Sequence, residues 1–126
     1  MKLSDIEHKS GIYFIYLCEE NQYKIGKGND VFHRLKTGYK QSFDVICVLY
    51  IDHYCLYELE AKILREIRKI EGVIQVKGRR EYFNFKSPLV FIAVLITIYY
   101  NYLQYYKKYG ENYNPYEDYT SGSEFD

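Results

Sequence analysis

Side chains that could take part in catalysis fall at the ends of the short elements that the sequence predicts. They comprise one phenol, four basic groups and two carboxylates: Tyr13, Lys24, Lys27, Arg34, Arg80, Glu60 and Glu81. A carboxylate, a guanidinium and a phenol can together accept a proton and stabilise negative charge on a substrate. Each residue also has an ordinary explanation as a sheet, helix-surface or turn residue. Only the order of the whole set is therefore informative.

The N-terminal half predicts a small sheet and one short helix. Residues 11–18 (GIYFIYLC) and 22–26 (QYKIG) are rich in β-branched and aromatic residues, and the polar residues between them predict a hairpin. Residues 43–51 (FDVICVLYI) form a nearly continuous apolar run, which is typical of a central strand covered on both faces. Between these strands, Asp30 is suited to cap a short helix that ends near Gly38.

Two longer helices are predicted in the C-terminal half. From Leu56 to Ile70, apolar residues recur at steps of three and four, which indicates an amphipathic helix. A basic bend (KGRR) and a possible short strand (EYFNF) follow it. Ser87 and Pro88 have the form of a helix N-cap and first turn, which predicts a helix over 87–109.

Composition limits the domain organisation and the cellular setting. The 126 residues, 48% of them apolar, suffice for one domain with one core. The formal net charge is zero, but residues 110–126 hold five acids and no basic residue, so the body carries +5 and the tail is predicted to be acidic and disordered. Three cysteines without a Cys-x-x-Cys pair argue against a disulfide framework or a zinc ribbon. A reducing intracellular location, in the cytoplasm or nucleus of a host cell or in a virion, fits best.

Several of these residues occur in an order that resembles the GIY-YIG endonuclease superfamily. Over residues 10–86 the chain has Gly11-Ile12-Tyr13, then Lys24-Ile25-Gly26-Lys27, then Arg34-Leu35, then Glu60 in LEAKIL, and it closes with GRREYF at 78–83. Lys24 stands where the family has its second tyrosine, as in the phage and large-DNA-virus branch with a KIG motif. The resemblance implies an α+β fold with a small three-stranded antiparallel sheet flanked by helices, here with an extra C-terminal helix. It divides the chain into a nuclease-like domain (1–86), a helix rich in apolar and Tyr residues (87–109) and the tail (110–126).

The resemblance also implies a division of labour in DNA phosphodiester hydrolysis. Glu60 would hold a single Mg²⁺ or Mn²⁺, an ion that accepts one carboxylate plus waters and a substrate phosphate. Arg34 would bind the scissile phosphate, and Tyr13 would be the general base or a relay to it. Because a phenol needs a nearby cation to act at neutral pH, Lys24 is the candidate for that cation. These four side chains are expected to converge on one concave face.

Other residues near the motifs are open to more than one interpretation. Lys27 and His33 could contact substrate phosphate, although plain surface exposure is the alternative for both. Glu58 competes with Glu60 as the metal ligand, but two helical residues about 200° apart cannot both face one site. Glu81 is expected to brace the fold through Arg79, Arg80 or a backbone amide.

Two functions and one partner surface remain open from the sequence. The chain is expected to be a metal-dependent DNA endonuclease, or else a catalytically inactive nucleic-acid-binding or virion-associated structural module. Tyr99, Tyr102, Tyr106, Tyr109 and Tyr113 follow helical spacing and could contact a second copy or another protein, or else the first of them pack on the domain itself. The apolar run 88–100 is shorter than the roughly 20 residues of a membrane span, so a membrane-spanning role is not expected.

Overall fold

The computed structural model describes residues 1–85 and 87–109, with the side chains of 106–109 outside the description. The predicted acidic tail, residues 110–126, therefore lies outside the described residues. Strands, helices and two short 3₁₀ turns follow one another in this order: η1 (Leu3–Asp5), β1 (Gly11–Leu17), β2 (Gln22–Gly28), α1 (Val31–Gly38), β3 (Phe43–Tyr50), η2 (His53–Cys55), α2 (Leu56–Ile67), β4 (Ile74–Gln75), β5 (Tyr82–Asn84) and α3 (Pro88–Tyr109).

The fold is α+β, with a five-stranded antiparallel sheet in the order β3-β1-β2-β5-β4. The hairpin β1–β2 agrees with the sequence pattern. The expectation that residues 43–51 form a central strand is wrong, because β3 lies at the edge of the sheet and pairs with β1. The predicted number of three strands is wrong, because β5 pairs with β2 at Tyr23 and Lys24 and β4 pairs in turn with β5. Strand β4 has two residues, too few for a period-two pattern to be recognised.

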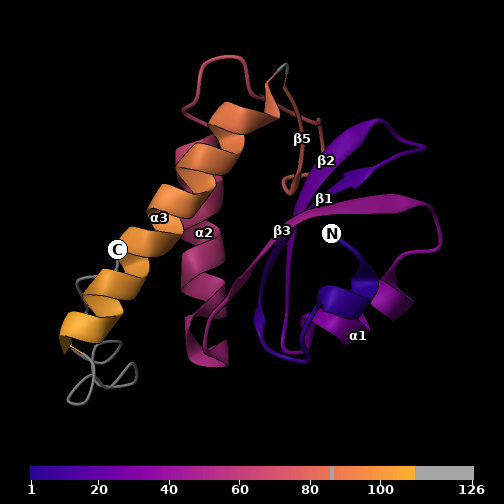
Figure 1. Ribbon diagram of the computed structural model, residues 1–126. Coiled ribbons are helices and arrows are strands. Elements are labelled where there is room, and N and C mark those ends of the chain that lie inside the picture. Colours follow the sequence, from indigo (N-terminus) through magenta and orange to yellow (C-terminus); the bar gives the residue numbers. More distant parts are fainter. Residues whose placement is uncertain (86, 110–126) are drawn as a thin grey trace.

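Helices cover both faces of the sheet (Figure 1). Alternate residues of β1 supply the two cores: Tyr13 and Ile15 pack with Leu35 of α1, whereas Ile12 and Phe14 pack with residues of α2 and α3. The side chains of β1 and β2 therefore point either to the face of the sheet covered by α1 or to the face covered by α2 and α3. This assignment decides which candidate residues can meet.

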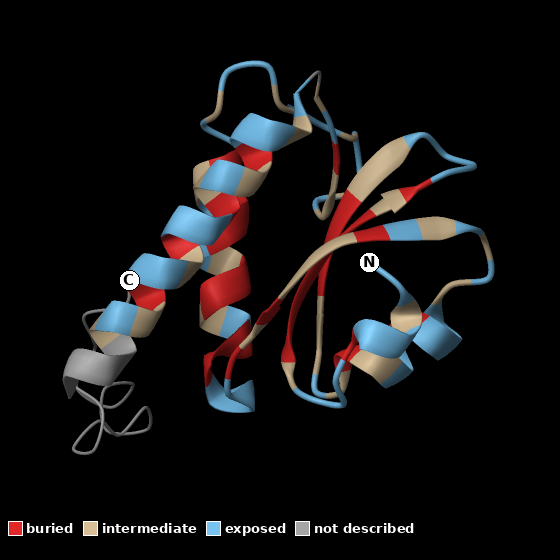
Figure 2. Ribbon diagram, viewed as in Figure 1, coloured by how far each residue is buried: buried red, intermediate tan, exposed pale blue. Residues whose placement is uncertain are grey.

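Helix α3 occupies the range that the sequence predicts, but it packs differently. A stripe along its length, rather than its first half alone, is buried: Phe91, Leu95, Ile98 and Tyr102 (Figure 2). Tyr102 belongs to the core, and the Tyr99 hydroxyl donates to the Tyr50 carbonyl oxygen at 2.6 Å. The idea that these two tyrosines face a partner is therefore wrong, because both pack on the domain itself. The side chains of Tyr106, Tyr109 and Tyr113 lie outside the described residues.

The three cysteines are free thiols, as their number and spacing predict. Cys18 is exposed near the β1–β2 turn, Cys47 is partly buried on β3, and Cys55 is buried at the start of α2. Burial raises the pKa of the Cys47 thiol to about 11, so it stays protonated and unreactive at neutral pH.

Candidate active site at the end of strand β2

Tyr13 is the centre of a buried polar cluster on the α1 face of the sheet. Its side chain is 1% exposed, and its hydroxyl lies 2.7 Å from the hydroxyl of Tyr39, with the two rings edge to face. The guanidinium of Arg34 also interacts with the Tyr13 hydroxyl, and this hydrogen bond and the charge interaction that accompanies it raise the pKa of Arg34. Two groups from the α1 segment therefore reach one phenol oxygen of β1.

The Tyr13 oxygen has one hydroxyl group and one cation as neighbours. Burial, and then the hydrogen bond with Tyr13, raise the pKa of Tyr39, so Tyr39 keeps its proton at neutral pH. Tyr39 can thus donate to Tyr13, while Arg34 brings a permanent positive charge to the same atom. A general base formed from Tyr13 would have both a donor and a cation in place.

Two glycines of β2 make room for this cluster. A Cβ built on Gly26 would lie 2.6 Å from Cε2 of Tyr13 and closer still to its hydroxyl end, because the ring lies directly over this residue. A Cβ on Gly28 would lie 3.2 Å from Cβ of Arg34. Strand β5 pairs with β2 only at Tyr23 and Lys24, so the Gly26–Gly28 end of β2 extends beyond it. The phenol and the guanidinium lie over this glycine-rich end.

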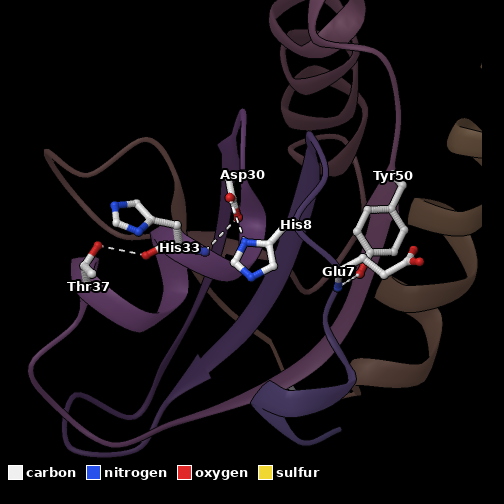
Figure 3. Close-up of polar contacts among 6 residues, drawn as sticks. All are labelled: Glu7, His8, Asp30, His33, Thr37 and Tyr50. Atoms are coloured by element: carbon white, nitrogen blue, oxygen red, sulfur yellow. Dashed lines mark hydrogen bonds and ion pairs between the residues drawn. The ribbon is translucent and has the colours of Figure 1, made fainter.

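Helix α1 owes its start, and hence the placement of Arg34, to Asp30. The Asp30 carboxylate accepts a hydrogen bond from the backbone N–H of His33 at 2.9 Å and lies 2.8 Å from Nδ1 of His8 (Figure 3). The His33 hydrogen bond, followed by the His8 contact, lowers the pKa of Asp30. The folded-state pKa of Asp30 is lower than its unfolded-state pKa. The stabilisation from this cap is therefore complete above the unfolded-state pKa, and it is lost as the pH falls through the folded-state pKa.

Lys24 joins the cluster through its neighbours. Its side chain is 9% exposed, its Nζ lies 3.8 Å from Oε2 of Glu81, and it stands 5.1 Å from the ring centroids of both Tyr39 and Tyr82. Glu81 also contributes weakly to the raised pKa of Arg34. Glu81 was expected to bind Arg79, Arg80 or a backbone amide, but its carboxylate forms an ion pair with Lys24 instead.

Glu60 does not share this face. It lies on α2, which packs on the opposite face of the sheet, and its Oε1 accepts from Nζ of Lys27 at 2.6 Å. The expectation that Glu60 converges with Tyr13, Lys24 and Arg34 on one face is therefore wrong. Alternation along β2 explains the difference, because Lys24 and Lys27 are three residues apart and point to opposite faces. Glu60 instead lies near the glycine-rich end of β2 on the opposite face of the sheet, where it contacts Lys27.

The two residues expected to contact substrate have different environments. Lys27 is engaged by Glu60 and stands 5.6 Å from the ring centroid of Tyr57, with 34% of its side chain exposed. His33 is an exposed residue of α1 whose backbone N–H donates to the capping Asp30 carboxylate, and its ring is directed away from His8 and Asp30 (Figure 3). Both side chains remain accessible to a ligand.

Comparison of the chain with protein-family models, with curated proteins and with solved structures finds no match. The geometry of the cluster therefore carries the functional argument.

One member of the cluster, Tyr39, was missed in the sequence, and another, Glu81, was expected to have different partners. Tyr39 is one of 17 tyrosines, so its residue type alone gives no signal. Its position directly after the helix-ending Gly38, one and a half turns beyond Arg34, was the available clue. The partner of Glu81 follows from the pairing of β5 with β2, since the adjacent Tyr82 lies opposite Lys24.

The ion pair between Lys27 and Glu60 gives a stability prediction. Lys27→Met should lower the free energy of unfolding by about 3 kcal/mol, because it leaves a buried carboxylate without its cation. Glu60 is only 5% exposed, so bulk water would screen the unpaired carboxylate weakly. Urea denaturation measures the loss, and Lys62→Met, on the partly exposed side of α2, is the control. The double variant Lys27→Met/Glu60→Gln should recover most of the loss, and strictly additive effects would contradict direct pairing.

Proposed function

We propose that this chain is a metal-dependent endonuclease that hydrolyses DNA phosphodiester bonds at the glycine-rich end of β2. One observation carries the proposal: the buried Tyr13 hydroxyl lies 2.7 Å from the Tyr39 hydroxyl and also interacts electrostatically with the Arg34 guanidinium. A phenol with a structural role alone needs one partner, whereas a phenol that must hold negative charge benefits from a donor and a cation together. The motif order of the sequence supports the same chemistry.

The proposed roles follow from what each side chain contacts. Tyr13 acts as the phenolate, which Tyr39 and Arg34 stabilise; it accepts a proton from the attacking water, directly or through a relay, and becomes a neutral phenol. Arg34 has exposed surface left over, with which it binds the scissile phosphate and stabilises its developing charge. Lys24, held between two tyrosine rings and Glu81, adds positive charge on the same face.

Glu60 is a chemically suitable ligand for a divalent ion. Its Oε2 is buried and has no hydrogen-bond partner among the described residues, so one carboxylate oxygen is free to bind a cation. No group of three or more His, Cys, Asp and Glu side chains gathers in the described part of the chain, so waters and substrate phosphate would complete the coordination shell. A bound Mg²⁺ or Mn²⁺ would supply Lewis-acid stabilisation of the leaving oxygen.

Cleavage of supercoiled plasmid in the presence of Mg²⁺ or Mn²⁺ tests the proposal. Arg34→Ala and Glu60→Gln should each abolish nicking. Their controls are Arg65→Ala and Glu58→Gln, two charge-removing changes on α2 at residues outside the cluster. No cleavage by the wild-type chain with either metal, or full cleavage by Arg34→Ala, would overturn the proposal.

A second function has one observation in its favour. Lys24 and Lys27 are both already paired with carboxylates, Glu81 and Glu60. This pairing suits a module that binds nucleic acid, alone or in a virion, without cleaving it. Retention of DNA by the wild-type chain in a gel-shift experiment, with no nicking under any metal, is the result expected for this alternative.

A further inference from the structure

An open cavity of about 690 Å³ lies beside the start of β2, at the far end of this strand from Gly26 and Gly28. Its walls come from the β1–β2 turn, from residues 70–74 between α2 and β4, from the end of β5 and from the start of α3. The volume falls within the range of about 300–1,000 Å³ that is typical of small-molecule sites. Among the described residues that line the cavity, none belongs to the candidate active site, so this is a separate feature of the domain.

Aromatic rings make up much of the cavity wall. The centroids of Tyr23 and Phe85 lie 4.2 Å apart and those of Phe85 and Phe91 lie 4.4 Å apart, with interplanar angles of 26° and 13°. Tyr16 adds a fourth ring, tilted by 53° to that of Tyr23. Tyr16, Tyr23 and Phe85 are each half-buried, so part of each ring is accessible. Such a wall suits a flat aromatic ligand better than a flexible aliphatic chain, because packing between rings adds to apolar burial.

Two exposed aliphatic residues extend the apolar wall towards solvent. Ile74 and Val90 are 66% and 54% exposed, and both line the cavity. Val90 lies in the window Pro88–Tyr105 of α3, which is long and apolar enough to cross a membrane by length and composition. The adjacent Phe91 is 1% exposed in the core cluster that contains α2, so this part of the window packs on the domain. A ligand in the cavity would cover apolar surface that the domain leaves open.

The polar groups of the cavity favour a ligand that donates hydrogen bonds. The Tyr16 hydroxyl donates its proton to Oδ1 of Asn21. In the amide orientation that satisfies its neighbours, the Asn84 nitrogen donates to the carbonyl oxygens of Asn21 at 3.0 Å and of Phe83 at 3.3 Å. Tyr16 and Asn84 can therefore offer a ligand only oxygen acceptors. Glu71, an exposed carboxylate, is a third acceptor and the one charged side chain among the described lining residues.

We propose that this cavity binds a planar heteroaromatic molecule that carries an amino group, the class to which adenine, cytosine and guanine belong. The ring would pack on the aromatic wall, and its amino group would donate to Glu71 or Asn84. The Glu71 carboxylate disfavours a negatively charged group beside it. The ring could belong to a free nucleoside or to an unpaired base of a single strand, because both present the same faces and edge. This site does not depend on the endonuclease proposal.

Isothermal titration calorimetry of the full chain with adenosine tests the proposal. Purine riboside, the same nucleoside without the amino group, should bind roughly 10-fold more weakly, because an acceptor of the cavity then lacks its donor. Glu71→Gln should weaken adenosine binding by roughly 10-fold, because a charge-assisted hydrogen bond becomes a neutral one. Glu7→Gln removes an exposed carboxylate outside the cavity and should leave the affinity unchanged.

Further measurements locate the binding and identify the source of the ring. Arg34→Ala, in the candidate active site, should leave adenosine binding unchanged, whereas Ile74→Ser should weaken it roughly 5-fold without altering urea denaturation. An oligodeoxyadenylate that binds more tightly than adenosine, with the same loss in Glu71→Gln, would assign the ring to a single strand. Weaker binding of the oligonucleotide would assign it to a free nucleoside. No adenosine binding at about 1 mM, equal binding of purine riboside, or wild-type affinity in Glu71→Gln would each overturn the proposal.

Discussion

Tyr13→Phe is expected to lower the rate of plasmid cleavage by about 100- to 10,000-fold, the usual contribution of a positioned proton-transfer group. The change removes one oxygen and keeps the ring that lies over Gly26. Because the hydroxyl contacts Tyr39 at 2.7 Å and interacts with Arg34, its loss separates the two functions of the cluster. Proton transfer should disappear, whereas phosphate binding through Arg34 should persist.

The expected result is therefore a large fall in the cleavage rate with nearly unchanged affinity for DNA. Tyr16→Phe is the matched control, since Tyr16 lies on the same strand and its hydroxyl donates to the exposed side chain of Asn21. Folding stability should fall by only about 1 kcal/mol through the lost hydrogen bonds. Equal cleavage by Tyr13→Phe and wild type would remove Tyr13 from the proposed mechanism.

Gly26→Ala is expected to have the second large effect, on stability and activity together. The added methyl group would overlap the Tyr13 ring, which must then leave its position over β2. Tyr13 is buried at 1% exposure, so the displaced ring has no vacant space to enter. We expect a loss of at least 1–3 kcal/mol in the free energy of unfolding, as for overpacked cores, and cleavage reduced as strongly as by Tyr13→Phe.

Gly38→Ala controls for the general effect of replacing a glycine. A Cβ there would meet Arg34 Cδ at an ordinary 3.6 Å, and alanine at the end of α1 should leave stability unchanged or slightly raised. Urea denaturation and plasmid cleavage measure both variants. A Gly26→Ala protein as stable and active as wild type would show that the Tyr13 ring can move without consequence.

The main elements and part of the site could be predicted because local patterns determine them. A β-branched and aromatic composition identified β1, the Asp30 cap identified the start of α1, and periodicity identified the amphipathic helix α2. Their order along the chain brought Tyr13 and Arg34 together correctly. These features depend on neighbours within a few residues of one another.

The remaining features depend on contacts between distant segments. Whether Glu60 or Glu81 contacts Lys24 depends on the face of the sheet to which each lysine of β2 points. It also depends on the pairing of β5 with β2, in which Lys24 lies opposite Tyr82, 58 residues later in the chain. The orientation of α3 is a different case. Apolar residues occur on all its sides, so periodicity could not show which stripe packs on α2 and which faces out.

The pairing of both β2 lysines with carboxylates changes how a phosphate would enter this site. Lys24 and Lys27 are each occupied by an anion that belongs to the chain itself, Glu81 and Glu60. An arriving phosphate that contacts either lysine displaces a tethered carboxylate rather than a condensed salt ion. The slope of log affinity against log salt concentration should therefore correspond to fewer released ions than there are basic groups at the site. Under the proposed function, the same competition would lower the affinity for DNA and would speed the release of the cleaved strand.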